Sequence, residues 1–128
     1  LNNIGQLQQW PLRLGITRGY FYGSEVEAML AKPGQLKFED VISDQVNLAK
    51  LNAGRISGFF VDPIVLAGLE PASGSVELHP LLIQTTSFHF IASRQSVSQQ
   101  VMQSFDAALA DLQASGELQA IIDRYQLH

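Results

Sequence analysis

Strand-like and helix-like segments alternate three times in the first 70 residues. The runs "PLRLGIT" (11–17), "QLKFEDVI" (35–42) and Ile56 to Val61 predict strands, and a segment with helical character follows each of them, at 24–32, 43–54 and 63–69. Successive parallel strands require crossover connections, which are almost always right-handed and usually helical. The alternation therefore predicts an α/β fold, with a twisted, mainly parallel sheet and helices on its faces.

Capping residues set the expected ends of these helices. Ser24 and Ser43 are candidate N-caps, and Gly54 is a candidate left-handed residue at a helix end. The apolar run Ile56 to Val61 ends on Asp62, followed by Pro63. Because a buried strand does not tolerate an interior carboxylate, we expect the strand to leave the sheet at Asp62 and a short helix to begin at Pro63.

The last third of the chain has a different organisation. Two β-like runs, "VELHPLLI" (76–83) and "SFHFIAS" (87–93), stand close together, and Pro80 marks an edge or a break in the first. Two C-terminal helices follow. The first opens with Ser96 three residues before Gln99, a capping-box spacing, and ends at Ser115-Gly116, whereas the second runs from Glu117 to about Tyr125. Each has an apolar face.

Composition excludes several functions. The chain has 128 residues, 46% of them hydrophobic, which is enough for a globular domain, and no cysteine. Its net charge is −4 and its Lys and Arg residues are scattered along the sequence, so nucleic-acid binding is not expected. No apolar stretch has the roughly 20 residues of a membrane span. His79 and His89 have no carboxylate at metal-ligand spacing, so no metal site is expected. The sequence also has no phosphate-binding glycine loop, and no other cofactor is expected.

The predicted sheet suggests where a ligand would bind. In open parallel sheets, ligands lie beyond the carboxyl ends of the strands, where loops and helix N-termini converge. The loop from Thr17 to Gly23 and the acid Asp62 both follow predicted strands. We therefore expect them to face one crevice.

The order of these features resembles the bacterial extracellular solute-binding proteins that deliver amino acids to ABC importers, the two-lobed periplasmic type called family 3. The segments that carry the resemblance are "LRLGITRGYFYG", "NLAKLNAGRISGFFVDPIVL" and "FHFIASRQSVSQQVMQSFDAALADLQASGELQAIIDRYQ". The resemblance implies a periplasmic substrate-capture protein, not an enzyme, for the uptake of an amino acid or similar solute. Its implied partners are a small polar solute and the membrane subunits of an ABC importer.

The resemblance also implies a domain organisation. Residues 1–87 would form the second lobe, a type II periplasmic-binding-protein lobe, and residues 88–128 a hinge strand and C-terminal helices that belong to the first lobe. The N-terminal part of lobe one would be absent from this chain. Its absence would uncover the apolar faces of the C-terminal helices, so we expect these to fold back on the sheet or to pair in a dimer of the truncated chain.

Site residues follow from the same resemblance. Gly19 matches a family glycine whose loop receives the α-carboxylate of the ligand, but Tyr20 and Phe21 replace the small hydroxyl residues that usually follow it. Asp62 matches the acid that pairs with the ligand's ammonium group. Thr17 and Arg18 precede Gly19 and are further candidates for the crevice.

Simpler interpretations and other functions stay open. Asp62 is also a suitable helix N-cap, the aromatic residues from Tyr20 to Tyr22 suit packing, and Arg18 suits a solvated surface. A phosphoacceptor receiver domain is excluded because "LGITRG" lacks the acidic pair that holds Mg²⁺. An α/β enzyme of solute-binding ancestry lacks a visible catalytic set. An extracytoplasmic ligand-sensing domain of a signalling receptor remains an alternative.

Overall fold

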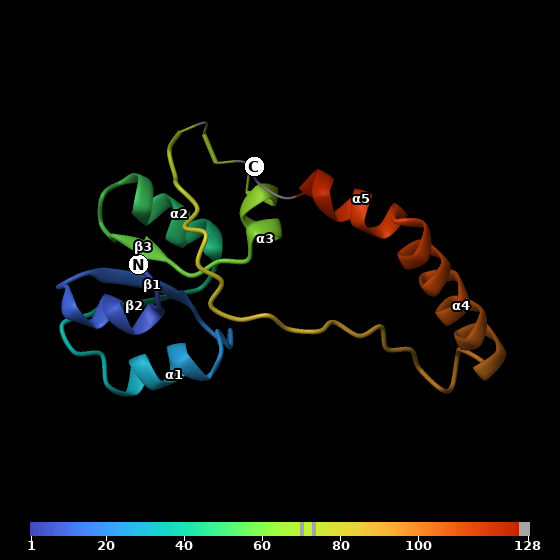
Figure 1. The fold of residues 1–128 in the computed structure, drawn as a ribbon. Coiled ribbons are helices and arrows are strands. Elements are labelled where there is room, and N and C mark those ends of the chain that lie inside the picture. Colours follow the sequence, from blue (N-terminus) through green and yellow to red (C-terminus); the bar gives the residue numbers. More distant parts are fainter. Residues whose placement is uncertain (70, 73, 126–128) are drawn as a thin grey trace. The chain divides into compact units, whose positions relative to one another are not determined.

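A computed structural model describes residues 1–69, 71–72 and 74–125 of the chain (Figure 1). The chain divides into two compact units, the first formed by Leu1–Thr85 and the second beginning at Thr86. They are called unit 1 and unit 2 below, and each is described by itself.

Unit 1 contains a three-stranded parallel sheet. Its strands are β1 (Arg13–Thr17), β2 (Lys37–Val41) and β3 (Gly58–Phe59), arranged in the order β2-β1-β3. Its helices are α1 (Ser24–Ala31), α2 (Asp44–Asn52) and the short α3 (Pro63–Gly68), and a 3₁₀ helix, η1 (Ile4–Gln9), precedes the sheet. Figure 1 shows α1 and α2 on opposite sides of the sheet. The predicted α/β class is confirmed at this level.

The central strand β1 separates two packing layers. Leu14 packs in a buried cluster with Val26 and Met29 of α1 and with Phe60. Gly15, the next residue, faces α2 so closely that an added Cβ would lie 2.1 Å from Oδ1 of Asn47. The alternation of side chains along a strand thus assigns one face of β1 to α1 and the other to α2.

Of the helix ends predicted at Ser24, Ser43 and Gly54, two are confirmed and one is wrong. Ser43 caps α2 by accepting a hydrogen bond from the backbone N–H of Val46, and Gly54 has a left-handed φ of 67°. However, α1 is preceded by Gly23 as its N-cap, and Ser24 is its first helical residue. The chain enters α1 through a φ of 100° at Gly23, a conformation that serine disfavours.

The third strand is shorter than predicted. The run Ile56 to Val61 was expected to be a strand throughout, but only Gly58 and Phe59 pair with β1. Ile56 and Phe60 are nevertheless buried. An apolar run in the sequence predicts burial, but a buried segment need not pair with a neighbouring strand.

The structure has no strand in residues 74–98, so the prediction of strands at 76–83 and 87–93 is wrong. The hinge strand that the resemblance implies within 88–93 is wrong for the same reason. A strand needs a neighbour for its backbone hydrogen bonds, and the described part of unit 2 supplies only helices. In unit 1, Ile83 packs against the buried cluster without joining the sheet. The assignment of residues to two lobes stays a prediction.

Both C-terminal helices are confirmed. They are α4 (Gln99–Ser115) and α5 (Glu117–Tyr125), separated by Gly116 in the left-handed conformation. The N-cap is Ser98, whose side chain accepts a hydrogen bond from Val101, and not the predicted Ser96. Within unit 2, the ring of Phe90 stacks on Phe105 with 4.4 Å between centroids. None of the helices in the described residues combines the length and the apolar character needed to cross a membrane.

Candidate functional site

The candidate site lies at the carboxyl edge of the sheet in unit 1. Because both strand pairs are parallel, with Thr17 opposite Val41 and Gly15 opposite Phe59, all three strands end at the same edge. The loop 18–23 leaves β1 there, and Asp62 follows β3 at the same edge. The predicted placement of these two segments beyond the strand ends is therefore observed.

A row of three aromatic rings connects the end of β3 with the loop after β1. The ring centroid of Tyr22 lies 5.6 Å from that of the buried Phe60 and 6.1 Å from that of Tyr20. The Tyr22 hydroxyl accepts a hydrogen bond of 2.7 Å from the backbone N–H of Thr17. Burial raises the pKa of the Tyr22 phenol above its ordinary value, although the hydrogen bond from Thr17 opposes this effect. Tyr22 thus fixes the start and the end of the loop.

Tyr20 and Phe21, two predicted ligand-binding residues, carry exposed rings. Tyr20 is 55% exposed and Phe21 67% exposed. Such exposure of adjacent aromatic rings is unusual for packing residues, and of the three aromatic residues in this loop only Tyr22 packs against the buried cluster. The packing interpretation thus holds for Tyr22.

Thr17 is buried and its hydroxyl is engaged inside the unit. It donates a hydrogen bond to the carboxylate of Asp44, and it accepts one of 3.2 Å from Nδ2 of Asn47. All three side chains are buried, and Oδ1 of Asn47 has no hydrogen-bond partner among the described residues. Thr17 therefore connects the end of β1 to the first turn of α2.

Arg18 and Gly19 form the exposed turn that follows. The Nε of Arg18 donates to both carboxylate oxygens of Asp40, at 3.2 and 3.3 Å, and both side chains are well exposed. Gly19 has a φ of 81° and no atom within 4 Å of the position of a Cβ. The backbone N–H of Tyr20 donates to the carbonyl of Thr17 at 3.2 Å, which closes the turn.

Asp62 is an exposed N-cap. Its Oδ1 accepts a 2.7 Å hydrogen bond from the backbone N–H of Ile64, with Pro63 at the first position of α3. The capping role predicted for Asp62 is confirmed. Among residues 1–69, 71–72 and 74–125, no side chain or backbone group forms a hydrogen bond with its Oδ2. Its role in ligand binding stays a prediction.

A small hollow of about 270 Å³ opens beside the start of α1. Phe21 lies on its wall, and the remaining lining comes from Gly23, Ser24, Glu25, Ile83 and Gln84. No side chain caps the N-terminus of α1, because Gly23 occupies the N-cap position. The first backbone N–H groups of a helix without a side-chain cap are available to an anionic group, although Glu25 and Glu27 in the first turn oppose it.

Comparison of the chain with protein-family models, with curated proteins and with solved structures finds no match. The interpretation of the site therefore depends on its own geometry. Within the described ranges, no group of three or more His, Cys, Asp or Glu side chains is arranged to hold a metal ion.

Sequence reasoning missed the buried polar residues that support this edge, Asp44 and Asn47. The large apolar residues of α2 are Val46, Leu48 and Leu51, yet the buried residues of this helix are Asp44, Asn47 and Leu48. Their spacing of three and four is that of one helix face. The signal that could have found them is this polar pair beside Leu48, combined with a glycine in the strand that the helix must approach.

Proposed function

We propose that unit 1 is a ligand-binding lobe for an amino acid or a similar small polar solute, in a periplasmic solute-binding protein that serves an ABC importer. The observation that carries this proposal is the pair of complementary groups at one sheet edge. Asp62 presents an exposed carboxylate, and α1 presents an N-terminus without a side-chain cap. A zwitterionic ligand carries a cation and an anion that match these two groups.

Each site residue has a distinct part in this proposal. Asp62 accepts hydrogen bonds from the ligand's ammonium group with Oδ2, since Oδ1 is used by Ile64. The exposed turn at Gly19 and the N-terminus of α1 receive the carboxylate through backbone N–H groups. The exposed rings of Tyr20 and Phe21 cover an apolar or flat part of the ligand.

Arg18 and Thr17 act indirectly in this proposal. Asp40 holds the Arg18 side chain at the base of the turn, and Thr17 anchors the loop through Asp44 and Tyr22. The proposal involves no catalytic step. The first lobe and the membrane subunits of an ABC importer are partners that the resemblance implies.

The test is a calorimetric titration of the product of the complete reading frame with the twenty amino acids and common polyamines. The proposal predicts saturable binding of at least one solute with a cationic nitrogen. A screen in which no such solute binds, with the protein folded by circular dichroism, would overturn it.

A further inference from the structure

Basic side chains in unit 1 gather at the edge of the sheet opposite the candidate site. Arg13 and Lys37 are the first residues of β1 and β2 and face each other in the strand register. Lys32 is the C-cap of α1, Lys50 lies in the last turn of α2, and Arg55 follows shortly before β3. We call these five residues the basic edge. The sixth basic residue of unit 1, Arg18, lies at the carboxyl edge.

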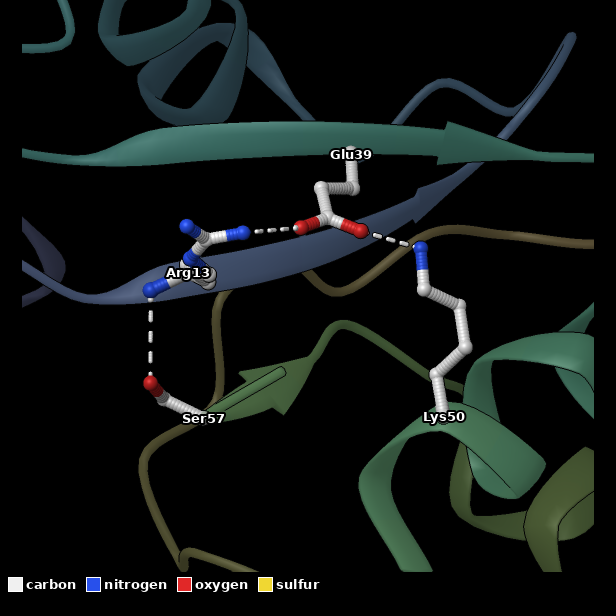
Figure 2. Close-up of polar contacts among 4 residues, drawn as sticks. All are labelled: Arg13, Glu39, Lys50 and Ser57. Carbon is white, nitrogen blue, oxygen red and sulfur yellow. Dashed lines mark hydrogen bonds and ion pairs between the residues drawn. The ribbon is translucent and has the colours of Figure 1, made fainter. Parts of the chain in front are cut away.

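Glu39 is an acid held inside this group (Figure 2). Nη1 of Arg13 lies 3.2 Å from its Oε1, and Nζ of Lys50 bonds to its Oε2. The hydrogen bond from Lys50 holds the pKa of Glu39 below its ordinary value, and Arg13 adds to this effect. Lys32, Lys37 and Arg55 form no ion pair within the described residues. The basic edge thus keeps a surplus of positive charge.

An open hollow of about 550 Å³ lies within the basic edge. Its walls are formed by Arg13, Glu39, Lys50, Gly54 and Arg55. Gly54 contributes no side chain and has no atom within 4 Å of the position of a Cβ, so the hollow is open to solvent on that side. The Ser57 hydroxyl accepts a 3.3 Å hydrogen bond from the backbone of Arg13 and stands at the same strand end (Figure 2).

Neither composition nor helix dipoles account for the whole basic edge. The chain as a whole has a net charge of −4, so the surplus does not reflect a basic sequence. Cations at helix C-termini are favoured by the helix dipole, which explains Lys32 and Lys50. Arg13 and Lys37 begin strands, where that effect is absent. Arg13 pairs with Glu39, but Lys37 and Arg55 have neither a helix dipole nor an ion pair among the described residues to account for their placement.

We propose that the basic edge is a docking surface for an acidic segment of a partner protein, with a carboxylate side chain entering the hollow between Arg13 and Arg55. Guanidinium groups bind carboxylates through paired hydrogen bonds, and an excess of cations around one acid attracts such a segment from a distance. At physiological ionic strength, charges more than about 8 Å apart are largely screened, and a five-residue strand such as β1 spans about 17 Å. The acids of the carboxyl edge therefore do not cancel this attraction.

A protein segment suits the hollow better than other polyanions do. A single carboxylate side chain can enter a concave site, whereas a flat anionic bilayer contacts only its rim. The net charge of −4 also opposes close approach of a highly charged duplex or bilayer to the rest of the chain. This inference is independent of the solute-binding proposal, since it concerns the opposite edge of the sheet.

The test uses the whole chain and a fluorescein-labelled ten-residue peptide of alternating glutamate and glycine, followed by fluorescence anisotropy at low and physiological salt. The double variant Lys37→Glu with Arg55→Glu replaces two cations with acids and so removes the positive surplus of the basic edge. Its matched control, Arg94→Glu with Arg124→Glu, changes the net charge equally but lies in unit 2. We expect about a tenfold or greater loss of affinity in the first variant, less than about a twofold loss in the control, and weaker binding at higher salt.

Several outcomes would overturn the proposal. Equal losses in both double variants would show that only net charge matters. Displacement of the peptide by an equal concentration of inorganic phosphate would reduce the hollow to a simple anion site. Tighter binding to phosphatidylserine vesicles than to the peptide would assign the edge to a membrane. Self-association in sedimentation experiments, if the first variant abolishes it, would assign the edge to a second copy of the chain. If the first variant fails to fold, Lys37→Gln with Arg55→Gln decides the same question.

Discussion

The hydroxyl of Thr17, at the end of β1, donates a hydrogen bond to the carboxylate of Asp44, which lies 27 positions later at the start of α2. Asn47 donates to the same hydroxyl, and the backbone N–H of Thr17 donates to Tyr22. Thr17 therefore connects the central strand β1, the helix α2 and the loop 18–23 through hydrogen bonds. The carboxyl edge of the sheet is held in place largely through Thr17.

Replacing Thr17 by valine should destabilise unit 1. The change keeps the shape of the side chain but leaves the buried Asp44 carboxylate without its donor, which costs about 1–3 kcal/mol. Thr17→Ser keeps the hydroxyl and is the matched control. Urea denaturation should show a larger loss in the free energy of unfolding for Thr17→Val than for Thr17→Ser. The reverse order would contradict the importance of this hydrogen bond.

Gly15 should not tolerate alanine. An added Cβ would lie 2.1 Å from Oδ1 and 2.8 Å from Cγ of Asn47, so the buried Asn47 side chain or α2 itself must move. We expect a loss of about 1–3 kcal/mol in the free energy of unfolding. Gly58→Ala, on β3, is the control, because its Cβ would meet Leu14 at an ordinary 3.8 Å. Equal effects of the two variants in thermal melts would show that the close approach is not limiting.

Glu39 should contribute to the acid sensitivity of unit 1. Its pKa is lowered in the folded chain by Lys50 and Arg13, so its stabilising effect is present above the ordinary value of 4.5 and is lost as pH falls through the folded-state pKa. Thermal melts between pH 7 and pH 3 should show a shallower decline for Glu39→Gln than for the wild type. The control is Glu77→Gln, which removes an acid that has no ion pair among the described residues. Its melting temperature should decline with falling pH as that of the wild type does. Identical slopes for all three proteins would contradict the lowered pKa.

Local sequence signals predicted much of the fold. The alternation of strand-like and helix-like segments indicated β1, β2, α1, α2 and the two C-terminal helices, because periodicity and turn residues act over short distances. Ser43 and Gly54 were correct caps for the same reason. The β-like run at 87–93 failed because the described part of unit 2 offers no partner strand, whereas the run at 76–83 belongs to unit 1 and does not join its sheet. Both outcomes depend on tertiary structure.

The candidate site was predictable only in part. The positions of Asp62 and the loop after β1 followed from the rule that parallel strands end at one edge. The supporting contacts were not predictable, since Thr17 meets Asp44 and Asn47 across 27 and 30 positions. The stacking of Tyr22 on Phe60, likewise, depends on how the strands align.

Asp62 should matter for ligand affinity more than for folding. A charge-assisted hydrogen bond contributes about 1.5–3 kcal/mol, so Asp62→Asn should weaken binding of a cationic solute by about ten- to a hundredfold. Folding should change little, because Asn can still accept the hydrogen bond from Ile64. Asp62→Ala should lose about 1 kcal/mol of stability through loss of the cap.

The most direct test of solute binding is therefore calorimetric titration of wild type and Asp62→Asn, as products of the complete reading frame, with the best-bound amino acid. Thermal melts of the same two proteins serve as the control for folding. The proposed site predicts a dissociation constant raised about ten- to a hundredfold in Asp62→Asn with nearly equal melting temperatures. Equal dissociation constants for the two proteins would leave Asp62 with its capping role alone and would contradict the site.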